Sequence, residues 1–235
     1  MYTFDGRVRY SEIDHNGTMK LTSLINYFQD CSTFQSEDVG LGLDVLKERG
    51  KAWILSYWQV VVNRYPGIGE EITTGTFATG FRGLYGYRNF IMDTKDGERL
   101  AYANSVWVFM DIEKGRPARP ADEDWHPYGM EPALSMDYED RKIKLPESGE
   151  CLPSFPVRRY HIDTNEHVNN CQYVQMALEI LPHDLRVHQV RVEYKKSAVY
   201  GDIIFPKITR GSKRTTVELC DEAGKPYAVV EIAED

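Results

Sequence analysis

The sequence predicts an α+β protein in which one helix followed by a run of antiparallel strands occurs twice along the chain. Three observations favour this fold class. A short polar segment, Asp14-His-Asn16, recurs 149 residues later as Asp163-Thr-Asn165. Each copy precedes a segment with helical spacing of apolar residues, which is followed by runs rich in β-branched and aromatic residues. Seven of the eleven prolines lie between residues 117 and 156, where this periodicity is lost.

The first helix is expected to begin just after Thr18, whose hydroxyl suits an N-cap, and to end near Gly40. Apolar side chains at three- and four-residue intervals give this helix one buried face: Leu21, Leu24, Ile25, Phe28 and Cys31. Four strands are then expected, over residues 52–63, 71–79, 87–93 and 99–111. The dipeptide Asp96-Gly97 predicts a hairpin turn between the last two.

The second helix is expected to be shorter, with Asn169 or Asn170 as its N-cap and Pro182 at its end. Strands are expected after it over residues 187–194, 202–209, 215–221 and 226–233. The chain therefore divides into three expected segments: a first domain of residues 1–120, a proline-rich connector of residues 121–151, and a second domain of residues 152–235.

Composition and length favour a soluble, cytoplasmic protein. With 42% hydrophobic and 27% charged residues, the 235-residue chain can bury a sizeable core. No uninterrupted apolar window approaches 18 residues, so no membrane span is expected, and the N-terminus lacks the basic and apolar regions of a secretory signal. The four cysteines are far apart, which favours reduced thiols. A net charge of −8 argues against nucleic acid as the main ligand.

Positive charge is nevertheless concentrated towards the C-terminus. Between residues 186 and 214 there are eight basic residues and two acidic ones. Two interpretations stay open: the solvated surface of the strands, or a docking patch whose local field attracts an acidic partner. The docking interpretation assigns partner binding to four residues: Lys195, Lys196, Arg210 and Arg214.

The most informative segment is the complete polar set of the second copy, Asp163, Asn165 and His167. Alternate residues of an extended chain point to the same side, so these side chains are expected to converge just before a helix start. Such a set can polarise a carbonyl and transfer a proton. Asp and Asn before a helix are also common caps and turn formers, and that structural role is expected for Asp14 and Asn16, which no histidine follows at the matching position.

No metal and no cofactor are expected. His161, Asp163 and His167 can be imagined as ligands, but the sequence supplies no further Cys, His or acidic residue at a ligand spacing. The glycines at positions 80, 83 and 86 match a phosphate-binding loop poorly and favour close packing within a sheet.

Several segments together resemble one protein family. They are Asp163-x-Asn165-x-His167-Val-Asn169-Asn170, then Leu178-Glu179-x-x-Pro182, and residues 192–196, 80–90 and 103–111. In this order, and over nearly the whole length, the chain resembles the acyl-acyl carrier protein thioesterases, whose plant and bacterial members consist of two hotdog domains in tandem. The resemblance implies two tandem hotdog domains, each a long helix wrapped by a curled antiparallel sheet.

The resemblance also implies an activity. The expected reaction is hydrolysis of the thioester of a fatty acyl-acyl carrier protein, which releases the free fatty acid and ends chain elongation in fatty acid biosynthesis. The expected partner is acyl carrier protein bearing the acyl chain on phosphopantetheine. Two alternatives stay open: an acyl-CoA thioesterase of the same fold, and a non-catalytic sensor that binds acyl thioesters. The oligomeric state stays open as well. A tandem hotdog already contains a pair of like domains within one chain, so the sequence does not decide whether the chain also forms a homodimer.

Thioester hydrolysis needs an activated water, donors for the developing oxyanion and a proton for the thiolate. Asp163 is assigned as the general base or the group that orients it. Asn165 is assigned as the amide that holds the water or the carbonyl, and His167 as the imidazole that hydrogen-bonds the reacting groups. Glu179, expected deep along the helix, is an alternative base or fixes a polar neighbour.

Substrate contacts are expected from the helix start and from the strand that follows the helix. Backbone N–H groups at Asn169 and Asn170 are expected to form an oxyanion hole, and Ser197 is expected to contact the substrate. Family members place an acidic residue and a cysteine at positions 197 and 198, where this chain has Ser197 and Ala198. A cysteine nucleophile at this site is therefore excluded, and the identity of the water-activating base stays open.

Overall fold

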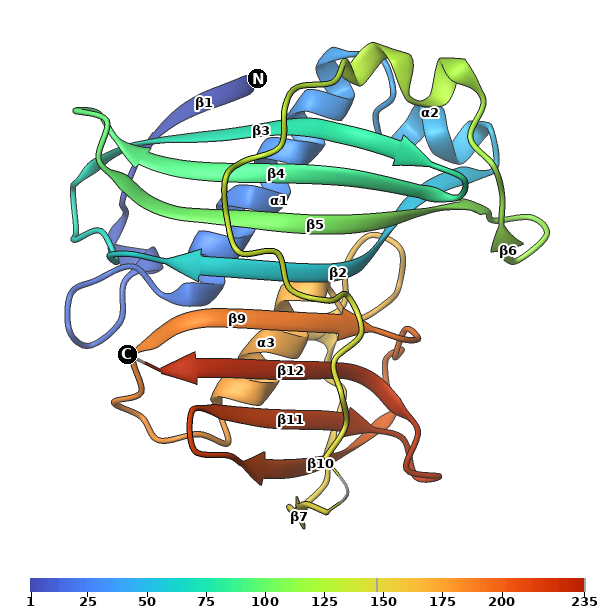
Figure 1. Ribbon diagram of the computed structural model, residues 1–235. Coiled ribbons are helices and arrows are strands. Elements are labelled where there is room, and N and C mark those ends of the chain that lie inside the picture. The colour runs from blue at the N-terminus through green and yellow to red at the C-terminus, as the bar shows by residue number, and fades with distance from the viewer. Residues whose placement is uncertain (147, 235) are drawn as a thin grey trace. The chain divides into compact units, whose positions relative to one another are not determined.

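The computed structural model describes residues 1–146 and 148–234, and the chain forms two compact units (Figure 1). The first unit comprises Met1–Ser56 and Val60–Tyr138, and the second comprises Tyr57–Gln59 and Glu139–Asp235. Each unit is described below by itself.

The first unit contains one long helix and a five-stranded sheet. Its helices and main strands are β1 (Tyr2–Arg7), α1 (Leu21–Asp38), α2 (Leu43–Glu48), β2 (Lys51–Val62), β3 (Glu71–Arg82), β4 (Tyr85–Thr94) and β5 (Arg99–Asp111). The strand order is β1-β3-β4-β5-β2, and the pairs from β1 to β5 are antiparallel. A short strand, β6 (Arg116–Pro117), pairs with β5, and single 3₁₀ turns lie at Tyr10–Glu12, Asp122–Asp124 and His126–Tyr128.

The core of the first unit lies between α1 and the sheet. Figure 1 shows α1 crossing behind the strands, and α1 contacts β3. The predicted apolar face of the helix is confirmed, since Leu24, Phe28 and Cys31 are fully buried. Phe28 packs on Phe90 of β4 with ring centroids 5.3 Å apart. Burial of such side chains contributes about 1.5–3 kcal/mol each, which explains why the helix stays on the sheet.

The second unit repeats this plan with a shorter helix. Its helix and main strands are α3 (Asn170–Leu178), β9 (Val187–Tyr194), β10 (Ile203–Arg210), β11 (Arg214–Cys220) and β12 (Pro226–Glu234). The sheet order is β9-β12-β11-β10-β7, where β7 is Glu150–Cys151, and β8 (Phe155–Pro156) also pairs with β10. α3 lies against β11 and β12 and buries Tyr173, Val174 and Ala177. Each unit therefore has the hotdog arrangement, and α3, with nine residues, is the shorter helix that the sequence predicted.

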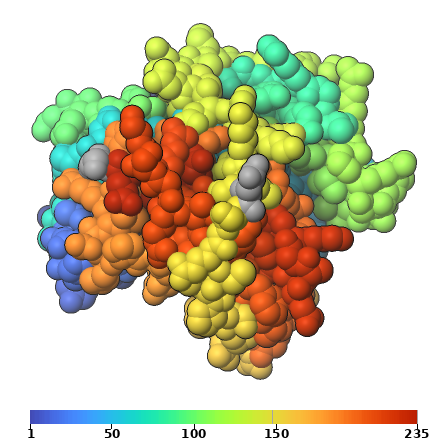
Figure 2. Space-filling view, turned by 60° about the horizontal axis from the view of Figure 1, so that its bottom comes forward, coloured from blue at the N-terminus to red at the C-terminus, as the bar shows by residue number. Residues whose placement is uncertain are grey.

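The proline-rich segment is fixed to each unit by its own hydrogen bonds. In the first unit, the Leu134 N–H and the Tyr138 hydroxyl donate to Asn89 Oδ1 at 3.0 and 3.1 Å. In the second unit, the Ile143 N–H donates to Glu193 Oε2 at 3.0 Å. Figure 2 shows this later part of the segment, in yellow, on the surface of the second unit beside its orange and red strands. Of the described residues from 130 to 149, none belongs to a helix or strand.

Two local expectations for the first unit are corrected by the structure. Lys20, not Thr18, precedes the first helical residue, because Thr18 closes the preceding loop by donating its N–H to Asp14 Oδ1 at 3.2 Å. The strand β1 and the helix α2 were not expected; β1 alternates half-buried and exposed residues and has little apolar signal. Of the helices described, none is long and apolar enough to span a membrane.

The sequence duplication is also a structural one. α1 begins at Leu21 and α3 at Asn170, 149 residues apart, and a 3₁₀ turn precedes each at Tyr10–Glu12 and Arg159–His161. The loops between turn and helix are closed in the same way, since the Asp14 N–H donates to Thr18 O and the Asp163 N–H to His167 O, both at 2.8 Å. The two loops can therefore be compared residue by residue.

Candidate active site

The segment from Asp163 to His167 is a tight turn, so the expectation of an extended segment is wrong. Besides the closing bond to His167 O, the Asn165 N–H donates to Asp163 Oδ1 at 2.8 Å and the Glu166 N–H donates to Asp163 O at 3.1 Å. A bridge between Ile162 and Val168 flanks the turn. Local hydrogen bonds to an Asp carboxylate compete with strand formation, which explains the conformation.

Glu166 occupies the strained position of this turn. Its φ is +60°, and it is the one residue other than glycine with positive φ in the described parts of the chain. The matching residue of the first unit is Gly17, with φ +77°. A side chain in the left-handed region costs roughly 1–2 kcal/mol, which glycine avoids. The second copy therefore tolerates strain that the first copy does not have.

The turn forms one wall of an open pocket of about 570 Å³ in the second unit. Asn165, Glu166 and His167 line it, together with Arg159, Ile162, Val199 and Tyr200. The structure thus brings together two of the three members of the predicted set. Asp163 is not on the wall as far as the described residues show, and its Oδ1 holds the Asn165 N–H instead.

The chain after β9 supports the turn from the other side. His167 pairs with Val199, and the Val168 N–H donates to Ala198 O at 2.9 Å. The Ala198 N–H in turn donates to the Tyr173 hydroxyl of α3 at 2.8 Å. Ala198 and Tyr173 are both buried, and burial raises the pKa of Tyr173 to about 12. This chain of hydrogen bonds fixes His167 relative to the helix.

The helix start supplies fewer free donors than expected. Asn169 is the N-cap: its Oδ1 accepts the Cys171 N–H at 2.9 Å, while its own N–H donates to His161 O at 2.8 Å. Asn169 N–H is therefore not free for an oxyanion, which corrects that prediction. The N–H of Asn170 has no acceptor among the described residues and remains a predicted donor.

Two further predicted residues lie away from the pocket. Glu179 is the C-cap of α3, where it is exposed and accepts a hydrogen bond from the Gln175 amide. Nine residues of helix at 1.5 Å each place it about 13 Å from the N-terminal end of α3. Its exposure corrects the expectation of a buried Glu, while its bond to Gln175 agrees with the alternative that it fixes a polar neighbour. Ser197 is exposed and is not on the described pocket wall.

The four basic residues predicted to bind a partner all pair with carboxylates of the second unit. Lys195 pairs with Glu193, Lys196 with Asp221, Arg210 with Glu150, and Arg214 with both Glu139 and Glu231. Arg214 lowers the pKa of Glu139 to about 2 through its hydrogen bonds. The expected surplus of positive charge is thus largely neutralised where these side chains lie.

His161 takes the place that Glu12 has in the first unit. The Arg158 N–H donates to His161 Nδ1 at 2.9 Å, as the Arg9 N–H donates to Glu12 Oε2 at 2.8 Å. Burial and the charge of Arg158 lower the pKa of His161, which keeps its Nδ1 available as an acceptor. His161 is therefore a structural group of the turn. Of the described residues, no three His, Cys, Asp or Glu side chains are grouped so as to hold a metal ion.

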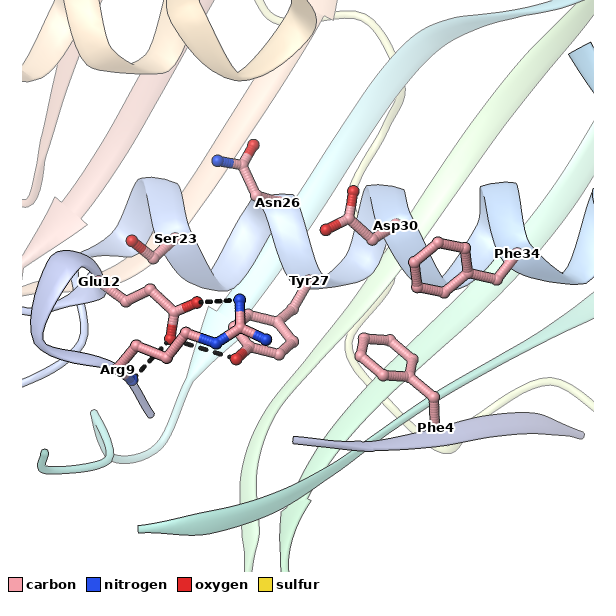
Figure 3. A pocket seen from close by; sticks show the side chains of 8 residues that line it. All are labelled: Phe4, Arg9, Glu12, Ser23, Asn26, Tyr27, Asp30 and Phe34. Atoms are coloured by element: carbon pink, nitrogen blue, oxygen red, sulfur yellow. Dashed lines mark hydrogen bonds and ion pairs between the residues drawn. The ribbon is translucent and has the colours of Figure 1, made fainter. Parts of the chain in front are cut away.

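The first unit has a different pocket, of about 310 Å³ (Figure 3). It lies along α1 and is lined by Phe4, Arg9, Glu12, Ser23, Asn26, Tyr27, Asp30 and Phe34. Figure 3 shows Glu12 accepting from the Tyr27 hydroxyl, at 3.2 Å, and pairing with Arg9. The turn residues Asn16 and Thr18 do not line this pocket, whereas Asn165 and His167 line the pocket of the second unit.

Sequence reasoning missed five residues of the pocket wall, and three of them carry polar or charged groups: Arg159, Glu166 and Tyr200. The signal for Glu166 was present, because a duplicated turn with glycine in one copy requires left-handed backbone at the matching position of the other. Arg159 and Tyr200 carry no comparable signal, since their places depend on the tertiary fold. The Arg159 guanidinium lies 5.8 Å from the centre of the Tyr200 ring.

Comparison with known proteins agrees with the fold. Residues 1–128 match the family described as "Acyl-ACP thioesterase N-terminal domain", and residues 147–232 match "Acyl-ACP thioesterase C-terminal domain". The chain belongs to the acyl-ACP thioesterase family, as the resemblance of its motifs predicted.

Among curated relatives, the chain is 28% identical over 207 residues to a chloroplastic acyl-[acyl-carrier-protein] hydrolase of Cuphea viscosissima, covering 80% of this chain and 50% of the relative. It is 23% identical over 218 residues to the chloroplastic oleoyl-acyl carrier protein thioesterase 1 of Arabidopsis thaliana, covering 84% and 60%. The chain thus spans about half the length of the curated relatives it matches.

Solved structures support the same fold. An acyl-ACP thioesterase from Bacteroides thetaiotaomicron superimposes with a TM-score of 0.89 at 20% identity, covering 99% of this chain and 97% of the other. The 12:0-ACP thioesterase from Umbellularia californica gives a TM-score of 0.87 at 20% identity, covering 100% and 98%. At this identity the likeness establishes the fold alone.

Proposed function

We propose that the chain hydrolyses the thioester of a fatty acyl-acyl carrier protein and releases the free fatty acid, which ends chain elongation. The observation that carries this proposal is the pocket whose wall presents Asn165 and His167 from a single turn in front of α3. Membership of the acyl-ACP thioesterase family supports it, as do the activities for which the curated relatives are named.

The pocket has the groups that hydrolysis by water requires. A water oxygen attacks the carbonyl carbon, the carbonyl becomes an oxyanion, and the C–S bond then breaks as the sulfur leaves. Asn165 can donate to the carbonyl oxygen, since its exposed side chain lies on the wall and its N–H is held by Asp163. An imidazole can both accept and donate a proton near neutral pH, so His167 suits delivery of a proton to the leaving sulfur.

Asp163 positions these groups in our proposal and does not act as the base. Its Oδ1 accepts the Asn165 N–H, and Asp14 accepts the Asn16 N–H in the same way at 2.9 Å. The first copy keeps this bond without the histidine, which supports a structural role for the aspartate.

We propose direct attack by water without a covalent acyl-enzyme. Cys171, the cysteine next to the turn, is buried in α3, and burial raises the pKa of its thiol to about 12. A thiol with so high a pKa is almost entirely protonated at neutral pH and is a poor nucleophile. Ala198 occupies the position at which the family resemblance placed a cysteine.

Acyl carrier protein, with the acyl chain on phosphopantetheine, is the proposed partner. Arg210 is the best placed of the four predicted basic residues, because its side chain and that of its partner Glu150 are 58% and 61% exposed. An exposed pair of this kind contributes only about 0–1 kcal/mol, so an acidic surface can replace Glu150 at little cost. Arg214 is held by two carboxylates and is better explained as part of the fold.

Steady-state hydrolysis of acyl-acyl carrier protein and acyl-CoA substrates with matched acyl chains tests the proposal. We expect a higher kcat/KM for the carrier-protein substrate. A higher kcat/KM for acyl-CoA would favour an acyl-CoA thioesterase, and tight binding of both thioesters without turnover would favour a sensor.

A further inference from the structure

Glu166 is the one carboxylate on the described wall of the pocket that holds Asn165 and His167. Its side chain is exposed, and no hydrogen bond or ion pair of that carboxylate is found among the described residues. The other acidic group of the turn, Asp163, already accepts the Asn165 N–H and lies off the wall. A base for the attacking water is therefore available at position 166.

The backbone at Glu166 gives a second, independent observation. The turn needs left-handed backbone there, and the matching turn of the first unit meets this need with Gly17. The second copy carries a glutamate at φ +60° in spite of the strain. Strained backbone is retained mainly where the side chain has a function, and here that side chain lies on the pocket wall.

We propose that Glu166 is the general base of the hydrolysis. This inference rests on the proposed thioesterase function and adds to it the group that activates the water. The Glu166 carboxylate takes a proton from water as the water oxygen bonds to the thioester carbon and the carbonyl electrons move onto oxygen. The tetrahedral adduct collapses, the C–S bond breaks, and His167 gives a proton to the sulfur. Proton transfer from Glu166 to His167 then restores both groups.

The surroundings of Glu166 fit this role. The charged and titratable groups that share the wall with it are Arg159, His167 and Tyr200. Arg159 comes from the preceding 3₁₀ turn, and Tyr200 from the chain after β9. His167 lies on the same wall next to Glu166, so both side chains can act on one bound substrate.

Two variants separate catalysis from structure. Glu166→Gln keeps the shape of the side chain but cannot accept a proton, and we expect kcat to fall by about 10²–10⁴-fold with little change in KM. Glu166→Gly also removes the base but relieves the strain, so its Tm should rise by about 2–4 °C while kcat falls equally. Added formate should restore part of the turnover of Glu166→Gly, because the small carboxylate can occupy the vacated space.

Glu222→Gln is the matched control, since it removes one exposed carboxylate from the turn between β11 and β12 and should leave kcat unchanged. Near-normal kcat in Glu166→Gln would overturn the proposal, as would a raised KM with unchanged kcat, which would indicate substrate binding alone. If the wild-type chain does not hydrolyse the acyl-carrier-protein thioester, the proposed function fails first. If the wild type is active and formate has no effect on Glu166→Gly, the base is another group.

Discussion

Replacing Tyr173 by phenylalanine should weaken both the fold and the turnover. The Tyr173 hydroxyl accepts the Ala198 N–H at 2.8 Å, and both residues are at most 2% exposed. Without the hydroxyl this N–H has no acceptor in a buried site, which typically costs about 1–3 kcal/mol. A cost of about 2 kcal/mol corresponds to a fall in Tm of roughly 4–8 °C for a chain of this size.

The effect on turnover follows from the same hydrogen-bond chain. Ala198 O accepts the Val168 N–H, and Val168 directly follows His167. A shift of the segment around Ala198 therefore moves the imidazole on the pocket wall, and misplacement by about 1 Å can reduce turnover by about 10²-fold.

Thermal unfolding and steady-state hydrolysis of Tyr173→Phe measure both effects. Tyr27→Phe is the matched control: it removes a buried hydroxyl in the first unit that donates to Glu12, and Glu12 keeps the Arg9 N–H. We expect Tyr27→Phe to lower Tm without lowering kcat. The reasoning is refuted if Tyr173→Phe retains both the Tm and the kcat of the wild type.

Four other predictions concern single features. Asp163→Asn, which keeps an oxygen acceptor for the Asn165 N–H, should retain far more kcat than Asp163→Ala; equal loss in both would indicate that Asp163 is a base. Mass spectrometry of enzyme quenched during turnover should show the unmodified chain, and an acyl adduct on Cys171 would contradict direct hydrolysis. The pKa of Glu139, lowered to about 2, means that its bonds to Arg214 stabilise the fold above about pH 4.5 and that this contribution is lost as the pH falls towards 2; Arg214→Gln should flatten the pH dependence of Tm in this range. Arg210→Glu should raise KM for acyl-acyl carrier protein at low salt and not for a short uncharged thioester; an equal effect on both would exclude docking.

The regular elements were predictable because they bury a repeated apolar pattern. β5 and β9 have the predicted limits, and the other main strands differ by one to three residues. The apolar face of α1 was predicted by spacing alone, since Leu24, Phe28 and Cys31 recur with the period of a helix. The duplication was visible because both loops need an aspartate at the same place to close.

The parts that were not predictable depend on local hydrogen bonds and on where a helix ends. Alternation of polar residues suggested extended chain before α3, whereas the Asp163 carboxylate folds the segment into a turn. Glu179 followed an apolar helical pattern and was expected to be buried, but α3 ends at Leu178 and Glu179 emerges into solvent. The basic cluster looked unpaired because its carboxylate partners, such as Glu139 and Glu150, come from distant parts of the sequence.

The most direct test of the account is the turnover of His167→Ala with an acyl-acyl carrier protein substrate. The side chain is exposed on the pocket wall, so its removal should leave the Tm close to that of the wild type. Loss of an acid–base group predicts a fall in kcat of at least about 10²-fold. Near-wild-type kcat in a folded His167→Ala variant would contradict the assignment of this turn as the active site.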